Sequence, residues 1–190
     1  MPKTQTRVNA PKITDNQLSI TWQTHTIANT LDTLKTQVAP KVSAAYFSTI
    51  WNRWNTHRRW QGKCCTPSWC LLCQQDNTTD SIEHYARCLV VKIAMSKYLN
   101  LDPYYYHNLH SILQVNPHIK HIDTAITLAL LTYGIYTTTN SLRQLYKNNT
   151  NPPQQPDLNF TYDLLIQNIK NGTANHTNST RTLDQRWMPH

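Results

Sequence analysis

Apolar residues recur at helical spacing along much of the chain. Ile27, Leu31, Leu34 and Val38 follow one another at steps of four, three and four residues, and Pro40 comes two residues later. Such spacing predicts an amphipathic helix that the proline breaks or restarts. The apolar residues are bunched between about residues 22 and 146, so the core is expected there.

A second helix is predicted to begin near Pro40 and to end near Gly62. Its last turns are basic, because Arg53, Arg58 and Arg59 stand where cations complement the negative end of the helix dipole. Its apolar stripe is formed by Val42, Ala45, Tyr46, Thr49, Ile50 and Trp54.

The next predicted helix begins at a capping box. Asp80 stands at the N-cap position and Glu83 follows three residues later, so that each side chain can accept a hydrogen bond from the other residue's backbone N–H. The helix is predicted to run to Leu99. Its apolar positions are Ile82, Tyr85, Ala86, Leu89, Val90 and Ile93.

Two further helices are predicted toward the C-terminus. Residues 121–146 form one long helix, or two nearly continuous ones, buried on more than one side. Threonines interrupt this run and leave far fewer than the ~20 apolar residues that a membrane span needs, so no membrane role is expected. A short docking helix, with Gly172 at its C-cap, is predicted from apolar positions at Leu158, Tyr162, Leu165 and Ile169.

The fold class predicted from these patterns is mainly α, a small helical domain with disordered tails. Residues 1–20 are expected to form a flexible N-terminal tail, because so few apolar residues cannot offset the chain entropy lost on ordering. The helical domain is expected over residues 21–148. Residues 149–190 are expected to form a tail rich in Pro, Asn and Thr, with one short helix.

The charge of the chain favours a polyanionic partner. The 190 residues include 18 Lys and Arg against 10 Asp and Glu, which gives a formal net charge of +8. Such an excess favours nucleic acid over a neutral partner. A basic surface that serves solubility alone would have the same composition.

Cysteine usage indicates a reducing compartment. The five cysteines are an odd number, and the first residues do not resemble a signal peptide, which argues against a secreted disulfide framework. Thiols bound to a metal fit better, and we expect an intracellular protein, nuclear or cytoplasmic.

The strongest chemical motif runs from Cys70 to Cys88. Cys70 and Cys73 have the spacing of a knuckle around one metal ion, while His84 and Cys88, at i and i+4, face the same side of the predicted helix. We expect one zinc ion within a module of residues 63–100. Four protein ligands leave no open coordination position, so the site is structural.

Two alternatives to this ligand set stay open. The thiols could be ordinary buried cysteines beside an unrelated histidine. Alternatively, Cys64 or Cys65 could replace one of the four ligands. Three thiolates and one imidazole around Zn²⁺ carry a net charge of about −1, which Arg87 and Lys92 could offset.

A basic and aromatic surface is the candidate for nucleic-acid contact. Arginines with aromatic neighbours suit phosphate contact and base stacking. The alternative is that the tryptophans belong to the core and the arginines to a solvated helix end. The candidate residues are Arg53, Arg58, Arg59, Trp60, Lys63, Arg87 and Lys92.

The motif resembles a known family. Cys70-x-x-Cys73 followed by Asp80-Ser-Ile-Glu-His84-Tyr-Ala-Arg-Cys88 is similar to the zinc-binding domain that follows the polymerase in non-LTR retrotransposon reverse transcriptases. Residues 52–61, with Trp, Thr and Arg-Arg, and residues 133–143, rich in Tyr, resemble flanking segments of protist versions. The likeness covers about residues 40–145.

The resemblance has two departures. Many family members have Pro directly after the last Cys, where this chain has Leu89, so the helix is expected to continue through this position. No polymerase Asp-Asp motif is present, and the resemblance therefore implies nucleic-acid contact in support of a polymerase, with that domain as a partner, and no catalysis.

The predicted function is that of a noncatalytic zinc module that binds RNA or DNA. The alternative is a zinc-stabilised protein–protein interaction module or an inactive relic of a mobile element. An enzyme is not expected, because Cys64 or Cys65 with His57 as a nucleophile pair would have no orienting carboxylate or oxyanion feature.

Overall fold

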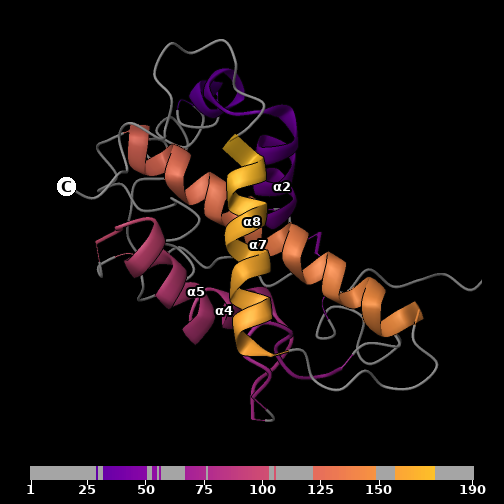
Figure 1. Ribbon diagram of the computed structural model, residues 1–190. Coiled ribbons are helices and arrows are strands. Elements are labelled where there is room, and N and C mark those ends of the chain that lie inside the picture. Colours follow the sequence, from indigo (N-terminus) through magenta and orange to yellow (C-terminus); the bar gives the residue numbers. More distant parts are fainter. Residues whose placement is uncertain are drawn as a thin grey trace, which may run out of the picture.

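The computed structural model describes residues 29, 32–50, 53, 54, 56, 67–75, 77–102, 105, 122–148 and 157–173. The mainly α fold class is confirmed for this part of the chain, in which no strand occurs (Figure 1). Residues 32–37 are helical. The other helical elements are α2 (Pro40–Ile50), α4 (Ile82–Tyr85), α5 (Leu89–Ile93), the π-helical segment η1 (Ala94–Tyr98), α7 (Ile122–Asn148) and α8 (Leu158–Thr173).

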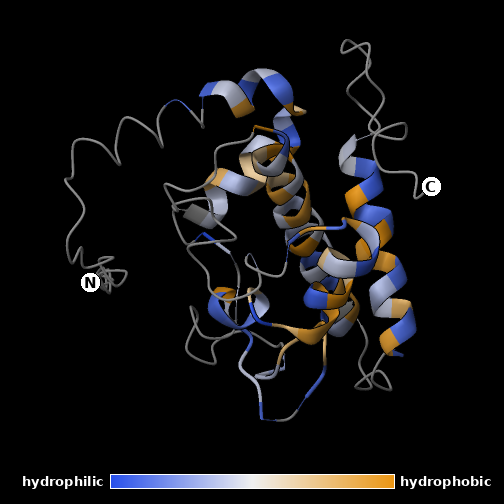
Figure 2. Cartoon of the chain, turned by 90° about the vertical axis from the view of Figure 1, so that its left-hand side faces the viewer, coloured by the Kyte–Doolittle hydropathy of each residue, from blue (hydrophilic) through white to orange (hydrophobic). Residues whose placement is uncertain are grey.

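Helix α7 is the central element, and it packs against both α2 and α8. It is one continuous helix, and buried residues on several of its sides, such as Ala129, Leu130 and Leu131, confirm the prediction. Hydrophobic residues gather where the helices face one another (Figure 2). Among the described helices, none has the length and apolar character needed to cross a membrane.

Threonines are tolerated inside α7 because their hydroxyl groups bond back to the helix itself. Thr132 Oγ1 donates to the carbonyl of Leu128, and Thr127 Oγ1 to that of Asp123, both at 2.8 Å. A buried hydroxyl whose hydrogen bond is made costs little. The threonines that interrupt the apolar run therefore still face the core.

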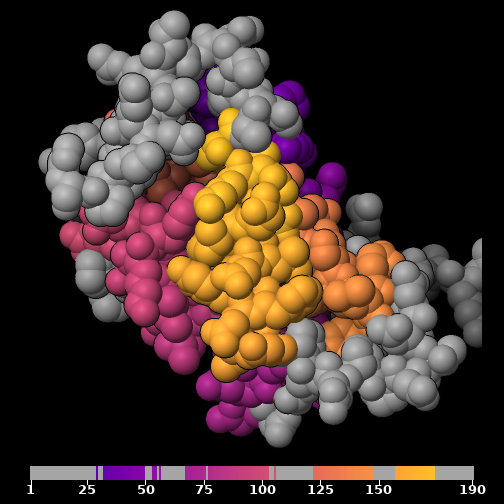
Figure 3. All heavy atoms as spheres, in the orientation of Figure 1, coloured from indigo at the N-terminus to yellow at the C-terminus, as the bar shows by residue number. Residues whose placement is uncertain are grey.

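Two glycines allow α7 and α8 to approach closely. A Cβ atom at Gly134 would overlap Cγ1 of Ile169, and one at Gly172 would lie 3.0 Å from both Leu130 Cδ2 and Tyr133 Cδ1. The prediction of Gly172 as a C-cap is wrong, because it lies inside α8 and is buried. Its missing side chain makes room for α7, across which α8 lies (Figure 3).

Helix α8 is the docking helix that the apolar spacing predicts. Leu165 and Ile169 belong to the same hydrophobic core as α7 and the Cys-rich loop. Asn168 Nδ2 donates to Thr138 Oγ1 at 3.0 Å. Lys41 Nζ donates to the carbonyl of Asn171 at 2.7 Å, which joins α2 to the end of α8. The C-terminal helix is thus part of the packed unit.

Helix α2 is shorter than predicted. It ends at Ile50, and Arg53 and Trp54 lie outside any helix. The N–H of Arg53 donates to the carbonyl of Ser48 at 2.7 Å, a wide turn that closes the helix. The chain departs from the helical path here because the Trp54 side chain is buried against residues of two other helices, as described below.

Candidate metal centre

The predicted ligands lie together. One potential ligand atom from each of Cys70, Cys73, His84 and Cys88 lies within 4.8 Å of all the others. The Sγ atoms of Cys70 and Cys88 are 3.8 Å apart, and Cys73 Sγ is 3.4 Å from His84 Nε2. Metal–ligand bonds of about 2.3 Å to sulfur and about 2.0 Å to nitrogen give tetrahedral edges of about 3.8 Å and about 3.6 Å. The group could therefore hold a metal ion.

The loop that presents Cys70 and Cys73 is a hydrogen-bonded knuckle. The N–H of Gln74 donates to the carbonyl of Cys70 at 2.9 Å, and Gln74 itself has a left-handed backbone, with φ of 54°. The N–H of Cys70 donates to Thr78 Oγ1 at 3.1 Å, and Thr78 Oγ1 donates to the carbonyl of Gln75 at 2.5 Å. The two sulfurs are thus aimed at one point by the backbone of residues 70–75 and by the Thr78 hydroxyl.

His84 is positioned by a different cap from the one predicted. The N-cap of α4 is Ser81, whose Oγ accepts from the N–H of His84 at 3.1 Å. The prediction of Asp80 as N-cap is wrong by one residue. The reason is that the Asp80 carboxylate is used elsewhere, by Tyr85 and Arg143, which leaves the next hydroxyl to serve the helix.

Cys88 does not share a helix with His84, contrary to the prediction. Helix α4 ends at Tyr85, and Cys88 is the N-cap of α5, with φ of −58° and ψ of 135°. This extended residue interrupts the helix while its sulfur approaches Cys70. Leu89, expected on the apolar face of a continuous helix, is instead 54% exposed at the first position of α5.

The three sulfurs differ in acidity. Burial raises the pKa of the Cys70 thiol well above its ordinary value. Hydrogen bonds from Cys70 and Cys88, and from His84, lower the pKa of Cys73 well below it. A metal cation would replace the remaining thiol protons as the counter-charge.

A buried ion pair ties the ligand-bearing loop to α7. Arg143 Nη2 donates to Asp80 Oδ1 at 2.9 Å, and their side chains are 4% and 0% exposed. Arg143 Nη2 also lies 3.2 Å from the Tyr85 hydroxyl, which donates to the same carboxylate oxygen. Burial and, next to it, the charge of Asp80 raise the pKa of Tyr85, so the phenol keeps its proton.

This network was missed in the sequence analysis. One signal was present, namely an arginine directly after Leu142 on a helix predicted to be buried on more than one side. A cation in such a place needs an anionic partner. The identity of that partner, 63 residues away, was not visible in the local pattern.

Trp54 is part of the core. It is 2% exposed, its Nε1 donates to Thr49 Oγ1 at 2.8 Å, and its ring centroid lies 5.9 Å from that of Tyr85 and 5.4 Å from that of Tyr136. Trp54 therefore agrees with the interpretation of the tryptophans as core residues and not with their interpretation as nucleic-acid contacts. It contacts both α4, through Tyr85, and α7, through Tyr136.

The predicted nucleic-acid contacts are described only in part. Arg53, Arg87 and Lys92 are all exposed. Arg87 comes two residues after the end of α4, between the candidate ligands His84 and Cys88, and Lys92 lies on α5. The predictions for Arg58, Arg59, Trp60 and Lys63, and for Cys64 and Cys65, fall outside the described residues.

The fold and the cluster together define a helical protein with a candidate metal centre of three cysteines and one histidine. Comparisons with models of protein families, with curated proteins and with solved structures found no match for this chain.

Proposed function

We propose that this chain is a noncatalytic helical module, stabilised by one structural zinc ion, that binds RNA or DNA. The observation that carries the proposal is the closed Cys3His cluster, in which four potential ligand atoms lie within 4.8 Å of one another. Soft thiolate ligands in a tetrahedral arrangement favour zinc among the common divalent metals. Four protein ligands leave no position for a reacting water, which favours a structural role.

The charge supports nucleic acid as the ligand. The chain carries a formal charge of +8. Arg143 is neutralised by Asp80 inside the core, so the excess is borne by other cations. Arg87 and Lys92 are exposed close in sequence to the metal ligands, where they could contact backbone phosphates.

The family resemblance gains support from packing. The three segments that carry it meet through Trp54, Tyr85 and Tyr136. The absence of the family's proline at position 89 is also a smaller difference than the sequence suggests. The helix breaks at Cys88 without a proline, and Leu89 occupies the first helical position, where proline is well tolerated. We therefore propose kinship with the zinc-binding domain of non-LTR retrotransposon reverse transcriptases.

The alternative, a protein–protein interaction module, relies on exposed aromatic residues. In residues 51–60, Trp54 is the tryptophan that the structure describes, and it is buried. Recovery of a protein partner that survives nuclease treatment would favour this alternative.

Elemental analysis of the purified chain should find about one zinc per chain. Cys73→Ser and His84→Ala should each abolish stoichiometric zinc, while Ser96→Ala, an exposed substitution on η1, should leave it unchanged. Zinc retained at full stoichiometry in Cys70→Ser would contradict the ligand set and point to Cys64 or Cys65.

Nucleic-acid binding is tested by fluorescence anisotropy with RNA and DNA strands at increasing salt. Affinity should fall steeply, because each neutralised phosphate releases counterions. Arg87→Ala and Lys92→Ala should each reduce the slope of log affinity against log salt by about one, with Ser96→Ala as the neutral control. Undetectable binding, or binding independent of salt, would contradict the proposal.

A further inference from the structure

The three cysteines of the candidate metal centre are close enough to be oxidised in pairs. The Sγ atoms of Cys70 and Cys88 are 3.8 Å apart, and the ligand atoms of the whole cluster lie within 4.8 Å of one another. A disulfide bond of about 2.05 Å therefore needs a shift of only about 2–3 Å between two of these sulfurs. A zinc ion would hold the same sulfurs as thiolates, which is the form that reacts with oxidants.

Cys73 is the cysteine of the cluster that is least covered by protein. It keeps 6% of its surface exposed, whereas Cys70 keeps 0% and Cys88 keeps 1%. An oxidant that arrives from solvent therefore meets Cys73 first, with the other two sulfurs behind it.

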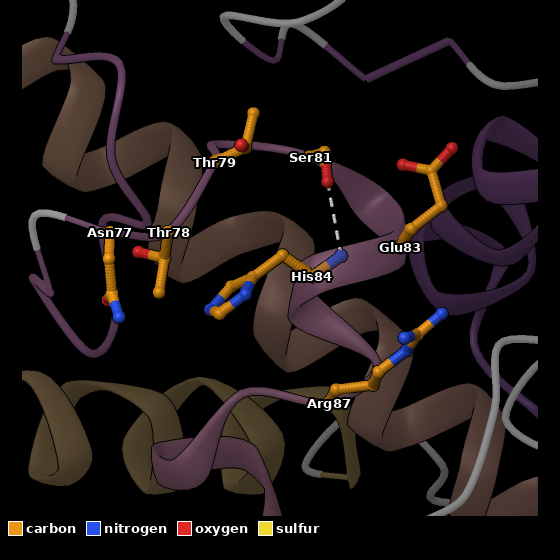
Figure 4. A pocket seen from close by; sticks show the side chains of 7 residues that line it. All are labelled: Asn77, Thr78, Thr79, Ser81, Glu83, His84 and Arg87. Carbon is orange, nitrogen blue, oxygen red and sulfur yellow. Dashed lines mark hydrogen bonds between the residues drawn. The ribbon is translucent and has the colours of Figure 1, made fainter.

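A polar pocket of about 430 Å³ lies beside the Cys73 sulfur. Its lining includes Thr78 and His84, and the imidazole of His84 points toward the segment that carries Asn77 and Thr78 (Figure 4). Cys73 Sγ is 3.9 Å from Thr78 Oγ1 and 3.4 Å from His84 Nε2, so the sulfur lies directly behind this lining. A water molecule takes about 30 Å³ in the liquid, and hydrogen peroxide has only one oxygen more, so the pocket has ample room for it.

We propose that the Cys3His cluster is a redox switch, in which hydrogen peroxide enters through this pocket, oxidises Cys73 and releases the metal. The Cys73 thiolate attacks one peroxide oxygen, the O–O bond breaks, and hydroxide leaves behind a sulfenic acid. The thiolate of Cys70 or Cys88 then attacks the Cys73 sulfur, which forms the disulfide and expels a second hydroxide. The two thiolates lose two electrons in total, and the peroxide accepts both.

The disulfide removes two of the four ligands, so the metal is no longer held. The inference rests on the proposed zinc module, to which it adds regulation of the same site. Because the metal joins the loop of Cys70 and Cys73 to α4 and α5, its loss should also abolish nucleic-acid binding, and a thiol reductant with zinc should restore it.

The test treats the zinc-loaded full-length chain with hydrogen peroxide and follows free zinc with a coloured indicator. About one zinc per chain should be released, the mass should fall by about 2 Da, and peptide mapping should find Cys73 joined to Cys70 or Cys88. Retained zinc, or a disulfide that lacks Cys73, would overturn the inference and leave the proposed function standing. A purified chain that holds no zinc before the oxidant is added would overturn both.

The route through the pocket has a test of its own. Thr79 is exposed and lines the pocket, so the indole of Thr79→Trp should obstruct it and slow zinc release several-fold without changing the initial zinc content. The matched control is Ser96→Trp, which adds the same side chain at an exposed position of η1 outside the pocket and should release zinc at the wild-type rate. Equal rates for the two variants would overturn the assigned route.

The link to nucleic-acid binding is measured by fluorescence anisotropy on the same samples. Affinity for an RNA or DNA strand should be lost together with the zinc and should return after treatment with dithiothreitol and zinc. Unchanged affinity after complete zinc release would overturn the regulatory role.

Discussion

The buried pair of Asp80 and Arg143 connects the metal-binding loop to the longest helix. Both side chains are removed from solvent, and the Tyr85 hydroxyl also donates to the carboxylate. An ion pair in such a place is costly to break from one side, because the remaining charge stays buried without its partner. The pair therefore holds the loop that carries His84 against α7.

Arg143→Met is expected to lower the free energy of unfolding by about 3–5 kcal/mol, since Asp80 would lose its counter-charge. Urea denaturation of the metal-loaded chain measures this. Lys147→Met, an exposed change on the same helix, should stay within about 0.5 kcal/mol of the wild type. Adding Asp80→Asn should recover part of the loss. The role assigned to the pair would be wrong if Arg143→Met and Lys147→Met unfolded alike.

At the scale of elements, the break between α4 and α5 determines where the fourth ligand lies. Cys88 has the extended backbone that is preferred before a proline, and Leu89 stands at the first position of α5. The first helical bond of α5 runs from the N–H of Lys92 to the carbonyl of Cys88 at 2.9 Å. The N–H at position 89 has no role in the helix.

Leu89→Pro should therefore preserve both fold and metal binding, with a stability equal to the wild type or greater by about 0.4–1 kcal/mol, because proline restricts the unfolded chain. Lys92→Pro, which removes the bond to Cys88, should cost about 3 kcal/mol or more. Thermal unfolding followed by circular dichroism distinguishes the two. Equal damage from both prolines would mean that the helix is continuous through residue 89.

The crossing of α7 and α8 depends on Gly134. Alanine normally stabilises a helix relative to glycine by about 1 kcal/mol, but its Cβ would here overlap Ile169. Gly134→Ala is therefore expected to destabilise the chain by about 1–3 kcal/mol. In the Ile169→Ala background the same change should cost less, while Ser141→Ala at an exposed site of α7 serves as the control. Stabilisation by Gly134→Ala would contradict the close packing.

At the scale of the whole molecule, the metal loop and the helices share one core. Cys70, Leu71, Leu72 and Tyr85 belong to the same buried cluster as residues of α2, α7 and α8. Because the loop has little regular structure of its own, a metal ion would contribute directly to the folding of the entire chain.

Removal of the metal by a chelator should lower the melting temperature and the helical circular dichroism of the whole chain in one transition. A ligand present at about a thousand times its dissociation constant contributes about 4 kcal/mol. Cys73→Ser should have the lowered melting temperature without any chelator, and the chelator should not lower it further. Ser96→Ala should behave as the wild type. An unchanged melting temperature after verified metal removal would contradict this coupling.

Local signals were sufficient for much of the protein. The spacing of Cys70, Cys73, His84 and Cys88 identified the cluster. Ligands to one ion must be close in space, and residues separated by few positions in the sequence can approach one another within a short loop. The periods of α7 and α8 were readable because apolar residues on a packed helix recur every three or four positions.

Tertiary structure decided the features that depend on residues far apart in the chain. The local sequence predicts Asp80 as a helix cap, but its carboxylate instead accepts a hydrogen bond from Arg143. It also predicts Gly172 as a helix end, but this glycine lies within α8 where α7 packs against it. The helix breaks at Cys88 although no glycine or proline stands there. The break brings the Cys88 sulfur close to that of Cys70, a contact that the local sequence does not reveal. Local sequence determined which residues form the site and the helices, and long-range packing determined how each is held, because buried charge and close contact are satisfied only in the folded chain.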